Sequence, residues 1–189
     1  MFNLDQIVTI TFTLFAVIDV IGSIPVIISV KNKIGKLESG KTTLVSGGLM
    51  VLFFFFGNRI LKVLGLDVHS FAVAGSIVIF LIAMEMILGL EFFKSDPDVK
   101  SGSVFPIAFP VISGSGTLTT IMSLKADFDA YNILVGILIN IGFIYLVLLS
   151  TDRIERFLGK AGLVVIRKFF GLILLAIAVK IFKSNISVL

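Results

Sequence analysis

Cysteine and tryptophan are absent from this 189-residue sequence, and histidine occurs once. Without cysteine there can be no disulfide, no thiolate metal site and no thiol-relay chemistry, and either redox compartment is compatible with that absence. No nucleotide-binding motif is present, which excludes a primary ATP-driven pump. The single histidine, His69, has no partner at metal-ligand spacing. We therefore expect no metal ion or other cofactor.

Charged residues are also scarce, at 15% of the chain, whereas 57% of the residues are hydrophobic. Soluble domains average about 25% charged residues, and a soluble fold of this size would lack the polar surface to cover its core. The mean hydropathy of +1.12 therefore predicts an integral membrane protein. The net charge of +4 does not indicate nucleic-acid binding, because the basic residues are spread between apolar runs.

Six apolar runs have the length needed to cross a bilayer core about 30 Å thick, which takes about 20 helical residues. Together they account for nearly the whole chain. The sequence thus predicts an all-α membrane protein, with residues 1–189 forming a single transmembrane domain of six transmembrane helices. The runs are Ile7–Val30, Thr42 to about Asn58, Val68–Leu90, Ser101–Leu124, Ala130–Thr151 and about Ile166–Ile186.

The positions of Lys and Arg predict how these helices are oriented, because cytoplasmic loops carry an excess of positive charge. With both termini outside, eleven of the 16 basic residues fall on the inner side and five on the outer side. We therefore expect a multi-pass protein with both termini outside. The first run does not resemble a removable signal peptide, since no Lys or Arg precedes it and no small-x-small cleavage site follows.

The two halves of the chain resemble each other in sequence. The segment Arg59–Gly65 matches Arg153–Gly159 at an offset of 94, and Ile82–Ile87 matches Ile177–Phe182 at an offset of 95. Each half, about residues 5–92 and about residues 101–187, holds three spans, so the second half must enter the membrane from the opposite face. The sequence therefore predicts two inverted repeats of three helices, a recurrent transporter architecture.

Proline is rare, and three of the four prolines interrupt the first span of a repeat. Proline removes a backbone donor, and paired glycines loosen the helix. In lipid, the freed backbone groups must be buried in protein or line a wet cavity. We therefore predict that the first and fourth helices are broken near the midplane, where their half-helix N-termini would favour an anion or carboxylate. The candidate substrate-binding residues are Asp19, Gly22, Ser23, Pro25, Pro110, Ser113, Gly114, Ser115, Gly116, Thr117 and Thr120.

Two carboxylates inside the spans are candidates for proton coupling. An ionised, unpaired Asp19 would be costly at the midplane and so should face the protein interior. It is interpreted either as a substrate or proton site or as a cap for the broken helix, and the two are compatible. Glu85 is interpreted either as a residue with a proton-linked role or as an interfacial carboxylate. Lys180, at the equivalent position of the other repeat, is expected to extend toward the outer interface, so that Asp19→Asn should disturb function more than Lys180→Gln.

Four stretches resemble the MarC family of membrane proteins, and together they cover almost the whole chain. The resemblance implies a bacterial or archaeal inner-membrane protein, distantly related to the LysE-type exporters. One departure is Ser-Gly-Ser-Gly at residues 113–116, where the family typically has Ala-Gly-Pro-Gly. The stretches are Asp19–Pro25, Ala74-Gly75, Pro106–Thr120 and Arg167–Val179.

Two classes of function fit these features. The first is a secondary transporter or exporter of a small polar or anionic solute. The second is an intramembrane enzyme acting on a lipid or phosphorylated substrate, which would need acids clustered with an Arg or His near the breaks. Asp19 is the one carboxylate at that depth, so we expect a protein that is not an enzyme. Its expected partners are membrane lipids and a small solute, with a homo-oligomer left open.

Overall fold

The computed structural model describes residues 3–34, 37–89, 106–125 and 127–186, and these residues form helices and short loops without a strand. Gly159, with φ 63° and ψ 173°, divides the last helix into two. Three of the eleven basic residues expected on the inner side, Lys36, Lys94 and Lys100, lie outside the described residues, as does the start of the predicted fourth span. The elements are α1 (Leu4–Ile18), α2 (Ile24–Ile34), α3 (Ser39–Val63), α4 (Val68–Leu88), η1 (Ile107–Ile112), α5 (Ser115–Leu124) and α6 (Ala130–Ile186).

Four of the described helices are long and apolar enough to cross a membrane. They are α3, α4 and the two halves of α6, Ala130–Phe157 and Ala161–Ile186, and α1 is a shorter apolar helix. The prediction of an all-helical protein with several membrane-crossing helices is thereby confirmed. Large apolar side chains such as Phe12, Phe55 and Phe169 are more than half exposed, as expected for a surface whose solvent is lipid.

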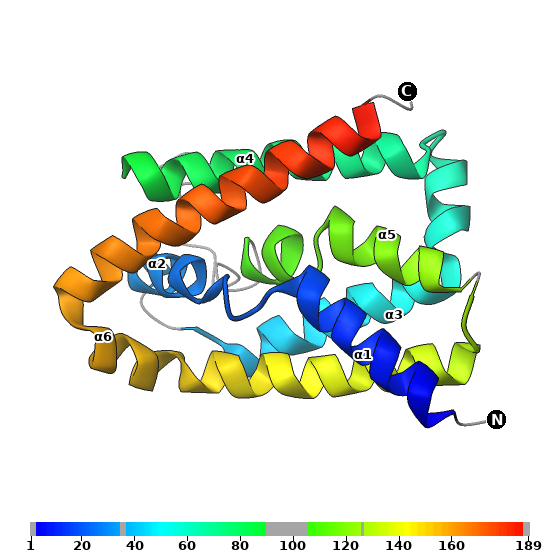
Figure 1. The fold of residues 1–189 in the computed structure, drawn as a ribbon, viewed down its shortest axis with the longest axis horizontal. Coiled ribbons are helices and arrows are strands. Elements are labelled where there is room, and N and C mark those ends of the chain that lie inside the picture. Colours follow the sequence, from blue (N-terminus) through cyan, green and yellow to red (C-terminus); the bar gives the residue numbers. More distant parts are fainter. Residues whose placement is uncertain (1–2, 35–36, 90–105, 126, 187–189) are drawn as a thin grey trace.

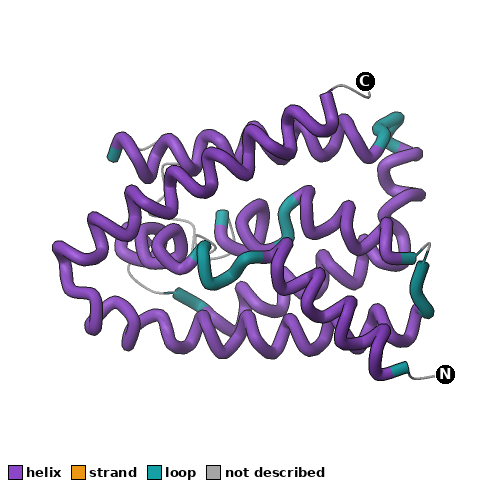
Figure 2. The backbone as a smooth tube through the Cα atoms, viewed as in Figure 1, coloured by secondary structure: helices purple, strands orange, loops and turns teal. Residues whose placement is uncertain are grey.

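The helical segments run back and forth along the long axis of the molecule (Figure 1). The second half of α6 lies beside α4 along one edge, and the first half of α6 forms the opposite edge. The two interrupted segments, α1–α2 and η1–α5, lie between these edges. Both described ends of the chain lie at the same end of the long axis. The loops that interrupt the two segments lie near the middle of the molecule (Figure 2).

The core forms where α1 approaches the first half of α6. Ile10, Leu14 and Ile18 recur every four residues along α1 and are buried, because this spacing places them on one helix face. Gly136 permits the close approach, since a Cβ added there would lie 2.6 Å from Ile10 Cγ2. Asn140 Nδ2 also donates a hydrogen bond to the carbonyl oxygen of Thr11 over 3.2 Å, which joins the two helices.

Polar contacts join helices at both ends of the bundle. At one end, Lys31 at the end of α2 forms ion pairs with Asp152 and with Glu155, the latter with Nζ and Oε2 2.6 Å apart. At the other end, His69 Nδ1 lies 3.0 Å from Asn185 Oδ1. Nearby, Asp67 caps α4, and hydrogen bonds from the hydroxyl and backbone N–H of Ser70 lower the pKa of Asp67. The Lys31 ion pairs and the contact between His69 and Asn185 join segments far apart in the sequence.

Candidate functional site

The first interruption is a turn that begins at Asp19 in a left-handed backbone conformation. The Asp19 carboxylate accepts a hydrogen bond from a backbone N–H of the same turn. Asp19 follows the last residue of α1 and adopts φ 44° and ψ 49°, a conformation that Asp tolerates better than most side chains. Its Oδ1 accepts a hydrogen bond from Gly22 N over 3.1 Å, and Ser23 Oγ donates to the Asp19 carbonyl over 2.9 Å. A Cβ added at Gly22 would overlap the Asp19 carboxylate. Asp19 therefore caps the break, as one of its two interpretations predicts.

The second interruption depends on backbone packing. The helix η1 ends at Ile112, and Gly114 precedes α5 without any side-chain cap. A Cβ added at Gly114 would overlap the carbonyl oxygen of Pro110, so any larger residue would force the backbone apart. Thr117 Oγ1 donates to the Ile112 carbonyl over 3.0 Å, which satisfies one backbone group freed by the break.

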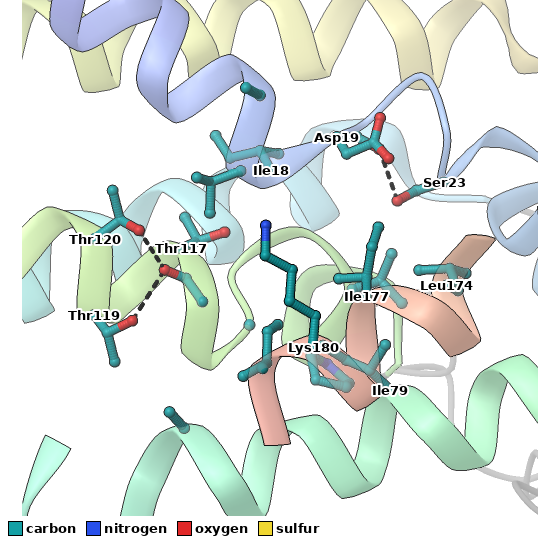
Figure 3. A pocket seen from close by; sticks show the side chains of 18 of the residues that line it. Ile18, Asp19, Ser23, Ile79, Thr117, Thr119, Thr120, Leu174, Ile177 and Lys180 are labelled. Carbon is teal, nitrogen blue, oxygen red and sulfur yellow. Dashed lines mark hydrogen bonds between the residues drawn. The ribbon is translucent and has the colours of Figure 1, made fainter. Parts of the chain in front are cut away.

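A cavity of about 410 Å³ lies between the two interruptions. Figure 3 shows it between the end of α1, the start of α5, α4 and the second half of α6. The residues that line the cavity are of three kinds: charged, hydroxyl-bearing and aliphatic. The predicted site residues that line it are Asp19, Ser23, Pro110, Gly114, Gly116, Thr117 and Thr120.

Four predicted site residues, Gly22, Pro25, Ser113 and Ser115, are not part of this lining. The two serines are completely buried and hydrogen-bonded to other helices. Ser113 Oγ donates to the Ser46 carbonyl of α3 over 2.9 Å. Ser115 Oγ packs against Gly75 and lies 3.5 Å from the carbonyl of Ala72 in α4. These hydroxyls hold the break against α3 and α4, and neither serine is among the residues that line the cavity.

Lys180 lies in the cavity, contrary to the expectation that it extends to the interface. Its side chain reaches from α6 toward Ile18 at the end of α1 (Figure 3). The sequence argument considered only how deep Lys180 lies, whereas the rotation of its helix decides which way it faces. Ile177, Ile181 and Ser184 also line the cavity, and their spacing places them on the same helix face as Lys180. This helical spacing is the sequence signal from which the position of Lys180 in the lining could have been predicted.

Further residues of the lining escaped the sequence analysis, among them Thr119 of α5 and Asn185 of α6. Thr119 lies between the predicted residues Thr117 and Thr120, so the pattern already spanned it, whereas no predicted site residue lies near Asn185 in the sequence. Glu85 is buried but is not among the lining residues, and its backbone carbonyl accepts a hydrogen bond from Arg167 Nη2 over 3.4 Å. Proton coupling by Asp19 or Glu85 stays a prediction.

These features define a polytopic helical membrane protein with a cavity between two interrupted segments. The chain belongs to the MarC family of integral membrane proteins, whose model matches residues 4–189. It is 28% identical to UPF0056 membrane protein MJ1677 of Methanocaldococcus jannaschii, covering 92% of both chains. It is 31% identical to UPF0056 membrane protein PH0760 of Pyrococcus horikoshii, over 92% of this chain and 90% of the relative. It is 26% identical to UPF0056 inner membrane protein YhgN of Escherichia coli K12, over 97% of both. No solved structure matches the chain.

Proposed function

We propose that this protein is a secondary transporter or exporter that moves a small polar or anionic solute across the inner membrane. The observation that carries the proposal is the cavity into which both interrupted segments open. In secondary transporters, discontinuous helices at corresponding positions of two repeats form the substrate site near the midplane. The positions of the interruptions after Ile18 and after Ile112 support this relation, since they lie 94 residues apart, as the sequence repeat does.

Contacts between the halves support an inverted repeat with six crossings, in which α1–α2 is the first crossing and η1–α5 the fourth. Residues related by a two-fold axis meet each other where they lie on that axis. Gly47 of α3 and Ile141 of α6 are separated by the repeat offset of 94, and a Cβ added at Gly47 would lie 2.6 Å from Ile141 Cδ1. This contact is expected if the axis passes between α3 and the first half of α6.

The third helices of the two halves support the same relation. Gly171 of α6 packs against Ala83 and Ile87 of α4. The residue 95 positions earlier, Ser76 of α4, lines a small hollow together with Ala178 and Phe182 of α6. Each helix therefore contacts the other at corresponding positions. Helices paired in this way can shift against the broken segments, which is the motion that alternating access requires.

The proposed orientation places both termini outside and the Lys31 ion pairs at the cytoplasmic end. The name of the Escherichia coli relative, an inner membrane protein, supports the location. Because the chain has no cysteine, single cysteines at Arg156 and Asp67 can be labelled selectively with an impermeant maleimide on intact cells and on inverted vesicles. The Arg156 position should be labelled only from the cytoplasm and Asp67 only from outside. Labelling of both from one side would overturn the six crossings and the inversion.

We propose transport rather than intramembrane hydrolysis, because the lining, as far as the described residues form it, includes one carboxylate and neither Arg nor His. Hydrolytic sites need a paired acid and base near the reacting bond. The test is flux through purified protein in proteoliposomes, measured on a solid-supported membrane with a panel of amino acids, organic acids and phosphorylated solutes. At least one solute should produce a saturable signal that Gly114→Ala abolishes and Lys168→Gln preserves. Turnover of a phosphorylated or lipid substrate without any flux would contradict the proposal.

A further inference from the structure

The cavity extends toward one end of the molecule. Along the second half of α6 its lining begins at Leu174 and reaches Asn185. Asn185 contacts His69, and this contact lies at the opposite end of the long axis from α2, which carries Lys31 and its ion pairs (Figure 1). The lining therefore runs from the middle of the molecule toward the His69 end and away from the Lys31 end.

An apolar cluster lies between the cavity and the Lys31 end. Its buried members are Val26 of α2 and Ile82 and Met86 of α4. Ile82 also lines the cavity, and Val30, which packs against the cluster, directly precedes Lys31. The cluster is thus continuous from the cavity to the ion pairs. Apolar side chains packed in this way leave no room for water or a polar solute to pass.

The ion pairs of Lys31 hold α2 against the first half of α6, where both Asp152 and Glu155 lie. The side chain of Lys31 is 17% exposed and that of Glu155 is 24% exposed, so water screens this pair less than it screens a pair on the surface. We propose that the apolar cluster and these ion pairs form a gate, which closes the cavity toward the Lys31 end and opens when α2 moves away from α6. The inference rests on the proposed function, because a transporter opens its site to each side in turn.

The backbone on both sides of the ion pairs allows this movement. The turn Asp19–Ser23 precedes α2, and the carboxylate that caps it accepts a hydrogen bond from Gly22 N. On the partner side, Gly159 follows Glu155 with a φ of 63° and open space around its Cα. Hinge motions are absorbed by a few residues of this kind at the ends of helices. Rotation of α2 about its turn would separate Lys31 from its partners and withdraw α2 from the apolar cluster while the helix stays intact.

Lys31→Gln should open the gate, because it leaves two carboxylates without their cation. Asp152 and Glu155 are three residues apart in one helix and so are neighbours on its surface, where like charges repel. Both would gain by turning toward water, and a carboxylate that loses its partner in a partly buried position destabilises the closed arrangement. The apolar cluster alone would then hold α2 in place.

A single cysteine at Val111 can report the opening, because the chain has no cysteine of its own and Val111 both lines the cavity and packs against the apolar cluster. An impermeant maleimide is applied to each side of the membrane in vesicles of both orientations. A separate cysteine at Arg156, next to the ion pairs, identifies the Lys31 side. In the parent protein, position 111 should react faster from the opposite side.

The expected result is reciprocal. Lys31→Gln should raise the labelling rate of position 111 from the Lys31 side about tenfold and lower the rate from the other side, because alternating access closes one side as it opens the other. An unchanged rate from the Lys31 side would overturn the gate. Rates that rise together from both sides would also overturn it, since they would show a loosened protein and not a gate.

Two further variants show whether charge is responsible. Lys41→Gln is the matched control, because Lys41 pairs with Glu38 within the same segment and its side chain is 66% exposed; it should change neither rate. Lys31→Glu should act like Lys31→Gln, and adding Glu155→Lys should return both rates toward those of the parent protein, because an ion pair of reversed polarity is restored. Failure of this second change to restore closure would contradict a gate held by ion pairs.

The outcomes separate this proposal from the proposed function, because labelling requires no solute. Reciprocal labelling without flux of any solute of the panel in proteoliposomes would contradict transport and leave the gate standing as the element that opens the cavity. Saturable flux together with labelling rates that Lys31→Gln leaves unchanged would overturn the gate and leave transport standing.

Discussion

Each interrupted segment must satisfy the backbone groups that its break frees. The two segments do this in different ways. In the first, Asp19 folds its carboxylate back onto Gly22 N, so the cap belongs to the break itself and is a flexible side chain. In the second, the Pro110 carbonyl packs directly on Gly114, and Ser113 bonds to the neighbouring helix α3. The first break thus carries charge into the cavity, whereas the second provides a rigid wall. In the proposed transporter, the first break would contact the solute while the second preserves the shape of the cavity.

The largest effect should follow from changing the rigid break. Gly114→Ala should destabilise the protein by about 3 kcal/mol, because the added methyl group meets backbone that cannot rotate away. The measurement is thermal unfolding in detergent. Gly116→Ala is the matched control two residues further on, since its Cβ would lie 3.7 Å from Ile181 Cδ1 and 3.8 Å from Val17 Cγ1. It should stay within about 0.5 kcal/mol of the parent protein. Similar unfolding temperatures for the two variants would show that the second break is not rigid.

A smaller effect is expected at the flexible break. Gly22→Ala should cost about 1 kcal/mol, because the methyl group meets the Asp19 carboxylate, which can rotate at the expense of its capping hydrogen bond. Gly48→Ala, in α3 with open space around it, is the control and should not destabilise the helix. Comparing the unfolding temperatures of the two variants isolates the clash. A loss at Gly22 as large as at Gly114 would contradict the difference between the two breaks.

The sequence predicted both breaks correctly because proline and glycine act locally. Pro110 and Gly114 interrupt a helix whatever surrounds them, and the repeated pattern in the other half pointed to Asp19. The directions of the side chains depend instead on how helices rotate against each other. Ser113 and Ser115 therefore turned out to be anchors, and Lys180, expected at the interface, turned out to line the cavity. Hydropathy sets the depth of a residue in the membrane but not the direction in which it points.

The smallest effects concern the serine anchors of the second break. Ser113→Ala should destabilise the protein by about 1 kcal/mol, because it removes a buried hydrogen bond of 2.9 Å. Ser115→Ala should cost less than about 0.5 kcal/mol, since its oxygen lies 3.5 Å from the Ala72 carbonyl and contributes a weak bond at most. Unfolding temperatures rank the two directly. A larger loss at Ser115 than at Ser113 would show that α4, and not α3, holds this break.

The central claim is that the two breaks face each other across one cavity, and a cross-link across it gives the most direct test. Val17 lies at the end of α1, and a Cβ at Gly116 of α5 would lie 3.8 Å from its Cγ1. Cysteines at these two positions should form a disulfide under mild oxidation, seen by mass spectrometry as the loss of both free thiols. The control pairs the cysteine at Val17 with one at Ser123, an exposed position further along α5, and should stay reduced. Free thiols at positions 17 and 116, or equal oxidation of both pairs, would contradict the account.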